Sequence, residues 1–324
     1  MLQDTKSGAV VQIDCHYVHP ERAAAYLLAS GGAAAFIDNN TEFAVPRLLQ
    51  ALEQQGLRPE QVAYLIITHV HLDHCGGTTE LLQHCPNATV LAHPSAVRHL
   101  YDPARLVAGT IAVYGEHAFT ALYRAVKPVP AGKVRAIADG ERIDLGGRTL
   151  TFVHTRGHAN HHMVIHDSET NGVFTGDTFG IAYPCLQYGS SPMLVSSSTP
   201  TEFDAKEAFI SAGKIMAMAP ERIYLSHYGI FTDPAKCAAL LRESIAALES
   251  ILEDGASGGM DGDALQTWCE DRVRADVFDT ARRCGLRMTP DEVTLLNYDV
   301  VMNARGLAYA ANRRRRTVGS GLSQ

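Results

Sequence analysis

The chain has 324 residues, of which 46% are hydrophobic and 19% are charged, and its formal net charge is −7. This composition is that of a globular protein with a sizeable core, and it excludes a collagen-like or mainly disordered chain. The acidic balance argues against nucleic acid as a partner, because phosphate binding requires a basic face.

Strand-like and helix-like segments alternate over the first 230 residues, and this pattern predicts a mixed α/β fold. Short apolar runs bounded by turn residues predict strands at 9–13, 33–37, 62–68, 88–92, 164–166, 172–175 and 222–225. Two strand-like runs within 142–153 flank Gly146-Gly147 and predict a hairpin. Apolar residues at helical spacing predict helices at 45–57, 78–85, 93–101, 203–218, 235–253, 264–284 and 290–312, with weaker helical character at 102–130.

The organisation of the chain changes near residue 233, beyond which only helices are predicted. A polar loop rich in Ser and Pro spans 183–201 before that point, and loops of this length are typically functional lids or mobile segments. We therefore expect a domain at 1–232, a C-terminal helical region at 233–316 and a disordered tail at 317–324.

Neither a membrane segment nor a disulfide framework is predicted. The longest uncharged stretch near the N-terminus, 23–36, is interrupted by Ser30-Gly31-Gly32 and is too short to span a bilayer. The seven cysteines are odd in number and never form a C-x-x-C pair. We therefore expect a cytoplasmic protein without a membrane partner, and the sequence leaves its oligomeric state open.

One short motif, THVHLDHCGG at 68–77, directly follows the clearest predicted strand. It contains three histidines and one aspartate within six residues. Residues two apart do not share a helix face, so an H-x-H pair suits a strand end or tight loop where alternate side chains converge. His69 and His71 can then point at one metal ion, while Asp73 and His74 reach a second.

Three further donors follow predicted strands in the same way, namely His158, Asp177 and His227. Each alone is weak evidence, because a single histidine near a strand is more often a hydrogen-bonded residue than a ligand. Together with the motif they supply seven nitrogen and oxygen donors. That number is enough for two metal sites that keep open positions for water.

The T-H-x-H-x-D-H motif and the three later donors resemble the metallo-β-lactamase superfamily, in particular its glyoxalase II-like hydrolases, from about residue 9 to 229. The resemblance implies an αββα four-layer sandwich as catalytic domain, with a C-terminal helical extension. The ligands it implies are His69, His71 and His158 for the first metal, Asp73, His74 and His227 for the second, and Asp177 as the bridge. Class B1 lactamases have a cysteine at the position of Asp177, which disfavours β-lactam hydrolysis.

These residues predict a dinuclear metal-dependent hydrolase. Two divalent ions would lower the pKa of a shared water, and the bridging hydroxide would attack a small thioester, lactone or phosphoester. Asp177 and Asp73 are the predicted catalytic carboxylates, with Asp177 bridging the ions and orienting the nucleophile. Zinc is the expected metal, with iron or manganese as alternatives, because imidazole and carboxylate ligands accept all three.

Two alternative functions remain open. The first is an iron-dependent, sulfur dioxygenase-like enzyme or an oxygen-binding diiron oxidoreductase, since relatives implied by the resemblance use similar ligands for iron. In the dioxygenase version His69, His158 and Asp177 would hold a single iron. The second is a metal-stabilised binding protein, which is disfavoured because such sites are normally closed shells of four ligands.

Five more residues are candidates for supporting the ligands or contacting the substrate: Asp38, His161, His162, Tyr183 and Tyr188. Asp38 ends a predicted strand and suits the orientation of a ligand. The two histidines could instead be ordinary hydrogen-bonded side chains, and the two tyrosines could instead pack within their loop. The basic run Arg313–Arg316 follows a helix, where cations complement the negative end of the helix dipole.

Overall fold

The computed structural model describes residues 10–198 and 202–321, with side chains up to residue 316. Its contacts divide the chain into two compact units. The first unit comprises Met1–His154, His161–Gly176 and Met218–Thr232, and the second comprises Thr155–Asn160, Asp177–Ala217 and Asp233–Gln324. Two segments that precede residue 233 therefore group with the C-terminal helices.

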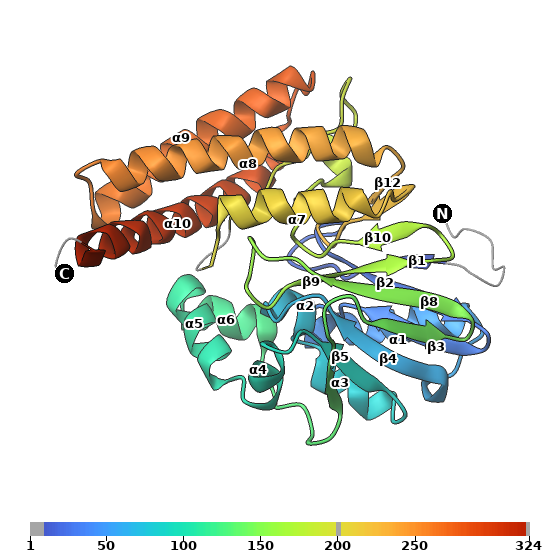
Figure 1. Ribbon diagram of the computed structural model, residues 1–324. Helices are drawn as coiled ribbons and strands as arrows, with labels where there is room; N and C mark the ends of the chain where they lie inside the picture. Colours follow the sequence, from blue (N-terminus) through green and yellow to red (C-terminus); the bar gives the residue numbers. More distant parts are fainter. Residues whose placement is uncertain (1–9, 199–201, 322–324) are drawn as a thin grey trace. The chain divides into compact units, whose positions relative to one another are not determined.

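The first unit contains two six-stranded sheets (Figure 1). Strands of the first sheet, in spatial order, are β1 (Val10–Asp14), β2 (Ala24–Ser30), β3 (Ala33–Ile37), β4 (Val62–Ile67), β5 (Thr89–Ala92) and β6 (Val134–Ala136). The second sheet has the order β12 (Ile230–Phe231), β11 (Arg222–Tyr224), β10 (Gly172–Phe174), β9 (Met163–Asp167), β8 (Arg148–His154) and β7 (Arg142–Leu145). The strands from β3 to β6 are parallel to one another, as are β10 and β11.

Alternate residues of the strands supply two separate hydrophobic cores, because successive side chains point to opposite faces of a sheet. Tyr26 of β2 faces the second sheet, where its ring lies 5.1 Å from that of Phe174 and 5.5 Å from that of Tyr224. Leu27, the next residue, is fully buried on the opposite face of the sheet. Both faces of the first sheet are thus covered, which fixes the register of its strands.

Helices of the first unit cover the outer face of the first sheet (Figure 1). They are α1 (Val45–Gln54), α2 (Leu72–Cys75), α3 (Thr78–His84), α4 (Val97–Tyr101), α5 (Ala104–Tyr114) and α6 (Glu116–Tyr123). In α1, Leu48 and Leu52 lie one turn apart on the buried face, as the period of the sequence predicts. Helices, first sheet and second sheet form three successive layers in this unit.

The second unit is helical and contains α7 (Ala205–Ala217), α8 (Pro234–Ser257), α9 (Gly262–Arg283) and α10 (Pro290–Gly321). Helices α8, α9 and α10 pack against one another (Figure 1) and bury aliphatic side chains such as Leu241, Val273 and Leu307. In the described parts of the chain, no helix is both long and apolar enough to cross a bilayer. Helix α10 extends to Gly321, beyond the expected helix end at 312, and residues 322–324 lie outside the described ranges.

The predicted fold class, a mixed α/β structure with two sheets and C-terminal helices, is confirmed. The hairpin at Gly146-Gly147 is also present, as β7 paired with β8. Strands β2, β6 and β12 and the single turn α2 lie outside the predicted set. In β2 the sequence AAYLLAS is buried on both faces, so it has no apolar/polar alternation to reveal a strand.

Candidate metal centre

The two sheets of the first unit bring several residues that flank the predicted donors to one edge. Asp38 and Thr68 follow the parallel strands β3 and β4, and Ser226 follows β11, so these residues lie at carboxyl ends of strands. The amide N–H of Met163, at the start of β9, donates to the Thr68 carbonyl at 2.9 Å. Likewise the amide of Ala24 donates to the Ser226 carbonyl at 2.8 Å. These bonds join the two sheets where the motif begins.

One group of possible ligands consists of Asp73, His74 and His227, whose ligand atoms all lie within 4.8 Å of one another. The single turn α2 places Asp73 and His74 next to each other just past β4. Oδ2 of Asp73 lies 3.4 Å from Nε2 of His227 and 3.9 Å from Nε2 of His74. Two imidazoles and a carboxylate at this separation can hold one divalent ion.

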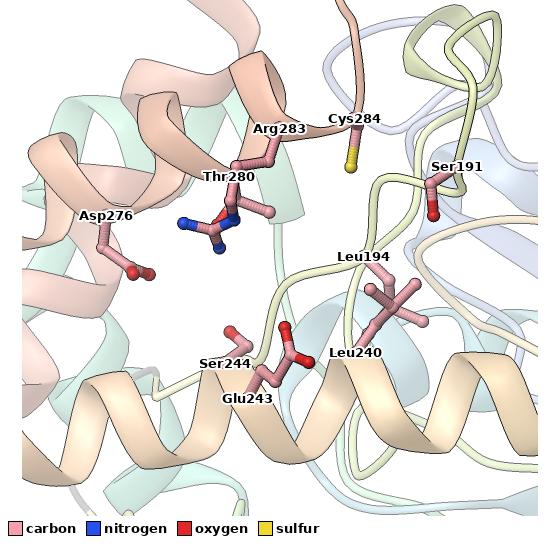
Figure 2. Close-up of a pocket in the computed structure, with 9 residues that line it drawn as sticks. All are labelled: Ser191, Leu194, Leu240, Glu243, Ser244, Asp276, Thr280, Arg283 and Cys284. Carbon is pink, nitrogen blue, oxygen red and sulfur yellow. The ribbon is translucent and has the colours of Figure 1, made fainter.

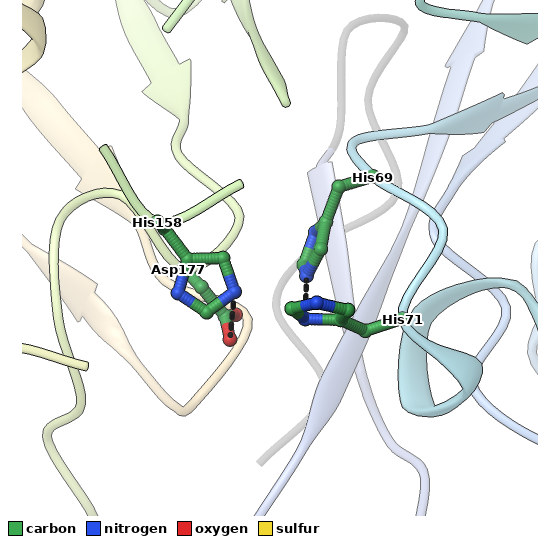
Figure 3. A group of neighbouring side chains, drawn as sticks. All are labelled: His69, His71, His158 and Asp177. Atoms are coloured by element: carbon green, nitrogen blue, oxygen red, sulfur yellow. Dashed lines mark hydrogen bonds and ion pairs between the residues drawn. The ribbon is translucent and has the colours of Figure 1, made fainter. Parts of the chain in front are cut away.

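A second group consists of His69, His71, His158 and Asp177, whose ligand atoms also lie within 4.8 Å of one another (Figure 3). Nε2 of His69 is 2.9 Å from Nδ1 of His71, and Nε2 of His158 is 3.5 Å from Oδ2 of Asp177. All seven donors predicted from the sequence therefore belong to one of the two groups. The structure places Asp177 with the three histidines expected for the first metal, and its bridging role stays a prediction.

Asp38 is a buried carboxylate that connects three segments of the site. Its Oδ2 accepts hydrogen bonds from Nδ1 of His74 at 2.8 Å and from Oγ of Ser226 at 3.1 Å. Its Oδ1 accepts from the amide of Thr68 at 2.9 Å. Because a carboxylate only accepts, the proton of the His74 ring must be on Nδ1, and Nε2 presents its lone pair to a ligand.

The same tautomer follows for two more imidazoles. The hydroxyl of Thr68 donates to Asp38 and therefore accepts from Nδ1 of His69 at 3.1 Å. Nδ1 of His227 donates to the carbonyl of Arg22 at 3.1 Å. In each ring the hydrogen bond at Nδ1 leaves Nε2 as the ligating atom, which is how metal-binding histidines are normally oriented. The residues present thus fit a pair of divalent ions.

His161 and His162 lie beside the ligand groups on the segment that leads into β9. Both are buried, and the ring of His162 is 4.9 Å from that of His69. The ring of His161 is 5.8 Å from that of His71, and its Nδ1 lies 3.4 Å from the Val70 amide. The candidate histidines are therefore neighbours of the possible ligands.

Tyr183 and Tyr188 form hydrogen bonds within the second unit. The hydroxyl of the buried Tyr183 donates to Oδ1 of Asp299 on α10 at 3.1 Å. Tyr188 is 52% exposed, and its hydroxyl donates to Oε2 of Glu292 on the same helix at 3.3 Å. Both contacts are of the kind that the loop-packing alternative predicts for these residues.

Sequence reasoning missed several residues that support the ligands. Thr68 and Ser226 each precede a possible ligand by one position, so a hydroxyl-histidine dipeptide at a strand end is a signal that could have found them. Asn40 donates through Nδ2 to the carbonyl of Asp73 at 2.8 Å. The contribution of Arg22 comes from its backbone carbonyl, for which no sequence signal exists.

Gly176, which immediately precedes Asp177, is expected to tolerate no side chain. Its φ is +49°, and a Cβ there would lie 2.4 Å from Nε2 of His162. We expect Gly176→Ala to lower the free energy of unfolding by about 2–4 kcal/mol, because strain and collision add. Gly32→Ala is the control, since Gly32 also has a positive φ but no atom within 4 Å of the added Cβ. Urea unfolding should show that Gly32→Ala lowers the free energy of unfolding by only about 1 kcal/mol. If the two variants lost the same amount, the expected collision with His162 would be contradicted.

The family follows from the fold and from this site together. A family model described as the metallo-beta-lactamase superfamily matches residues 20–227, which is more than half of the chain. The chain therefore belongs to the metallo-β-lactamase superfamily, whose members are mostly hydrolytic enzymes. The matched range contains all seven residues of the two ligand groups.

A similar protein of the same superfamily is the metallo-beta-lactamase fold-containing protein ST1585 of Sulfurisphaera tokodaii. It is 26% identical over 224 residues, which cover 66% of this chain and 78% of that protein. The solved structure of ST1585 from Sulfolobus tokodaii aligns with a TM-score of 0.67 and 21% identity, covering 93% of this chain and 99% of that one. At this level of identity the structural likeness shows the fold.

Two further relatives carry names that mention an activity. Thioesterase pkgB of Emericella nidulans is 28% identical over 155 residues, covering 47% of this chain and 34% of that protein. Coenzyme F420H(2) oxidase of Methanothermobacter marburgensis is 26% identical over 238 residues, covering 65% of this chain and 51% of the oxidase. The chain thus spans about a third of the first relative and half of the second.

Proposed function

We propose that this protein is a dinuclear metal-dependent hydrolase of small ester-type molecules, with the ligand set of the glyoxalase II-like hydrolases. The observation that carries the proposal is the presence of two adjoining ligand groups built from imidazoles and carboxylates. A structural metal site is a closed shell around one ion, whereas seven donors for two ions leave positions open for water and substrate. Zinc is the expected metal, with iron or manganese as alternatives.

In such a hydrolysis the metal ions and the carboxylate of Asp73 have different roles. Bound divalent ions lower the pKa of water toward neutrality and polarise the carbonyl or phosphoryl oxygen under attack. The side chain of Asp73 is 20% exposed, whereas those of His74 and Asp177 are 2% and 6% exposed. Asp73 is therefore the carboxylate that solvent and substrate reach, and its oxygen that does not face the ion can hold the proton of the attacking water and return it to the leaving group.

Asp38 and the hydroxyl of Thr68 act through the histidines rather than on the substrate. By accepting from Nδ1 of His74 and His69, they fix which ring nitrogen faces the ions. His161 lies beside His71, which is the more exposed histidine of its ligand group, and we assign it a substrate contact. The substrate itself is a small molecule, and a thioester is the first class to test, in view of the relative named as a thioesterase.

The decisive experiment combines metal analysis with a substrate panel. We expect about two divalent ions per chain, and turnover of at least one thioester, lactone or phosphoester that is lost on chelation and restored by the metal. A protein that holds two ions and hydrolyses no member of the panel, while consuming oxygen with a persulfide or a reduced cofactor, would replace the hydrolase by an oxidoreductase.

That second candidate is an iron-dependent oxygen-binding or sulfur dioxygenase-like enzyme. It is favoured by the relative named as an oxidase and by the absence of thiolates from both ligand groups, because imidazole and carboxylate also suit iron. Seven donors favour two metals over one. Oxygen uptake by the iron-loaded protein, measured beside the hydrolase panel, separates the two functions.

A further inference from the structure

The segment that follows Asp177 is a folded strap rather than a free loop. We define the strap as residues 178–198. Ile181 and Val195 pair across it in both directions, with backbone hydrogen bonds of 2.8 Å and 3.1 Å. Inside the strap, Nε2 of Gln187 donates to the Met193 carbonyl at 2.8 Å, and Oε1 accepts from the Met193 amide at 3.2 Å. The two arms of the strap therefore move together.

Asn303 of α10 binds the end of the strap through its side chain and its backbone. Oδ1 accepts from the Ser198 amide at 2.7 Å, and Nδ2 donates to the Ser196 carbonyl at 3.1 Å. The backbone carbonyl of Asn303 accepts from Oγ of Ser198 at 3.1 Å. Asn303 is 2% exposed, so water cannot replace these bonds if the side chain is removed.

The strap is also held on the side of α8 and α9, where the Cys284 carbonyl just after α9 accepts from the Ser190 amide at 2.9 Å. Oγ of Ser244 accepts from the Ser196 amide at 2.8 Å on that side. Next to this contact lies a cavity of about 110 Å³, lined by Ser191 and Leu194 of the strap and by residues of α8 and α9 (Figure 2). Side chains that line a cavity lose packing contacts, whereas Asn303 on α10 is buried.

We propose that Asn303 is a positioning residue for Asp177, acting from the C-terminal helical region on a metal ligand. Its bonds fix Ser196 and Ser198, the pairing of Val195 with Ile181 transmits this restraint, and the Gly180 amide donates to the Asp177 carbonyl at 3.2 Å. The C-terminal helices are thus part of the metal-binding machinery. The inference rests on the proposed function only in taking Asp177 as a metal ligand.

Titration with Co²⁺ tests this role, because the visible spectrum of bound Co²⁺ reports its ligand geometry without any substrate. In Asn303→Ala we expect affinity for one of the two ions to fall about tenfold and the spectrum of that ion to change. The other ion, at Asp73, His74 and His227, should bind as in the wild type. Asn297→Ala is the matched control, because Asn297 is on the same helix but binds Arg274 of α9.

The control variant should lose stability without a change in Co²⁺ affinity or spectrum. If Asn303→Ala does not fold, Asn303→Asp serves instead, since it keeps an acceptor for the Ser198 amide and removes the Nδ2 donor to the Ser196 carbonyl, and an affinity drop of about threefold is expected. Wild-type affinity and spectrum in the folded variant would overturn the proposal. A protein that hydrolyses no ester but shows this selective loss would refute the proposed function and leave the role of Asn303 intact.

Discussion

Replacing Asp177 by alanine should remove one of the two metal ions and lower turnover by about a thousandfold or more, which corresponds to about 4 kcal/mol of transition-state stabilisation. The reason is that Asp177 supplies the only carboxylate to the group that contains His69, His71 and His158. Without Asp177 the remaining three ligands are neutral imidazoles, which do not offset the positive charge of a divalent ion. His69→Ala should have the same effect, because it removes a buried donor from the same group.

Elemental analysis and steady-state rates on the same preparation check this expectation. Asp271→Ala is a suitable control, since Asp271 is an exposed aspartate of α9 far in sequence from the donors. It should keep both its metal content and its turnover. Full metal content with wild-type turnover in Asp177→Ala would show that this carboxylate is not a ligand, and the dinuclear assignment would then have to be abandoned.

Replacing Asp38 by alanine should weaken metal binding by about 10- to 100-fold, although Asp38 is itself outside both ligand groups. The change removes the acceptor that holds the protons of His74 and Ser226 and leaves buried donors unsatisfied. Each unsatisfied donor costs about 1–3 kcal/mol, so the free energy of unfolding should also fall by several kcal/mol. Asp38→Asn keeps an acceptor for Thr68 and tolerates the left-handed backbone, where φ is +56°, so it should be less destabilising.

Competition with a chelator and urea unfolding separate the two effects of this change. Asp14→Ala is the control, because Asp14 is also a carboxylate that accepts backbone hydrogen bonds, from His16 and Glu21, yet it lies outside the metal centre. It should lower stability without lowering metal affinity. If a folded Asp38→Ala variant bound metal as tightly as the wild type, the hydrogen bond to His74 would have no part in orienting that ligand.

Most of the fold could be read from local patterns. The strands with continuous apolar runs, such as β4, and the hairpin at Gly146-Gly147 are set by residues adjacent in sequence. Strand β2 could not be read in this way, because burial on both faces removes the alternation that marks a strand. Helix α10 continues past its expected end at 312 through a run of arginines, of which Arg313 donates to the Phe203 carbonyl and Arg315 to backbone carbonyls near the end of α8.

In the metal centre, too, local sequence predicts some features and misses others. The donors were identifiable because the motif at 68–77 concentrates them and because the others follow predicted strands. Among the residues that orient them, Asp38 was expected from its place at the end of a predicted strand, whereas Thr68, Ser226 and the Arg22 carbonyl were not. Asp38 and Ser226 are 188 residues apart, and His227 and Arg22 are 205 residues apart. Contacts over such separations exist only after the sheets pack, so no local period can encode them.

The sequence by itself determined the chemical identity of the donors, the class of fold and the positions of most strands and helices, because these depend on residue type and on spacing within one element. Only the tertiary structure decided that His69, His74 and His227 present Nε2, since that choice depends on the partner of Nδ1 in each ring. The tertiary structure also grouped the segments 155–160 and 177–217 with the C-terminal helices. Buried hydrogen bonds such as those of Asn303 join the second of these segments to α10, and they become favourable only when packing removes the competing water.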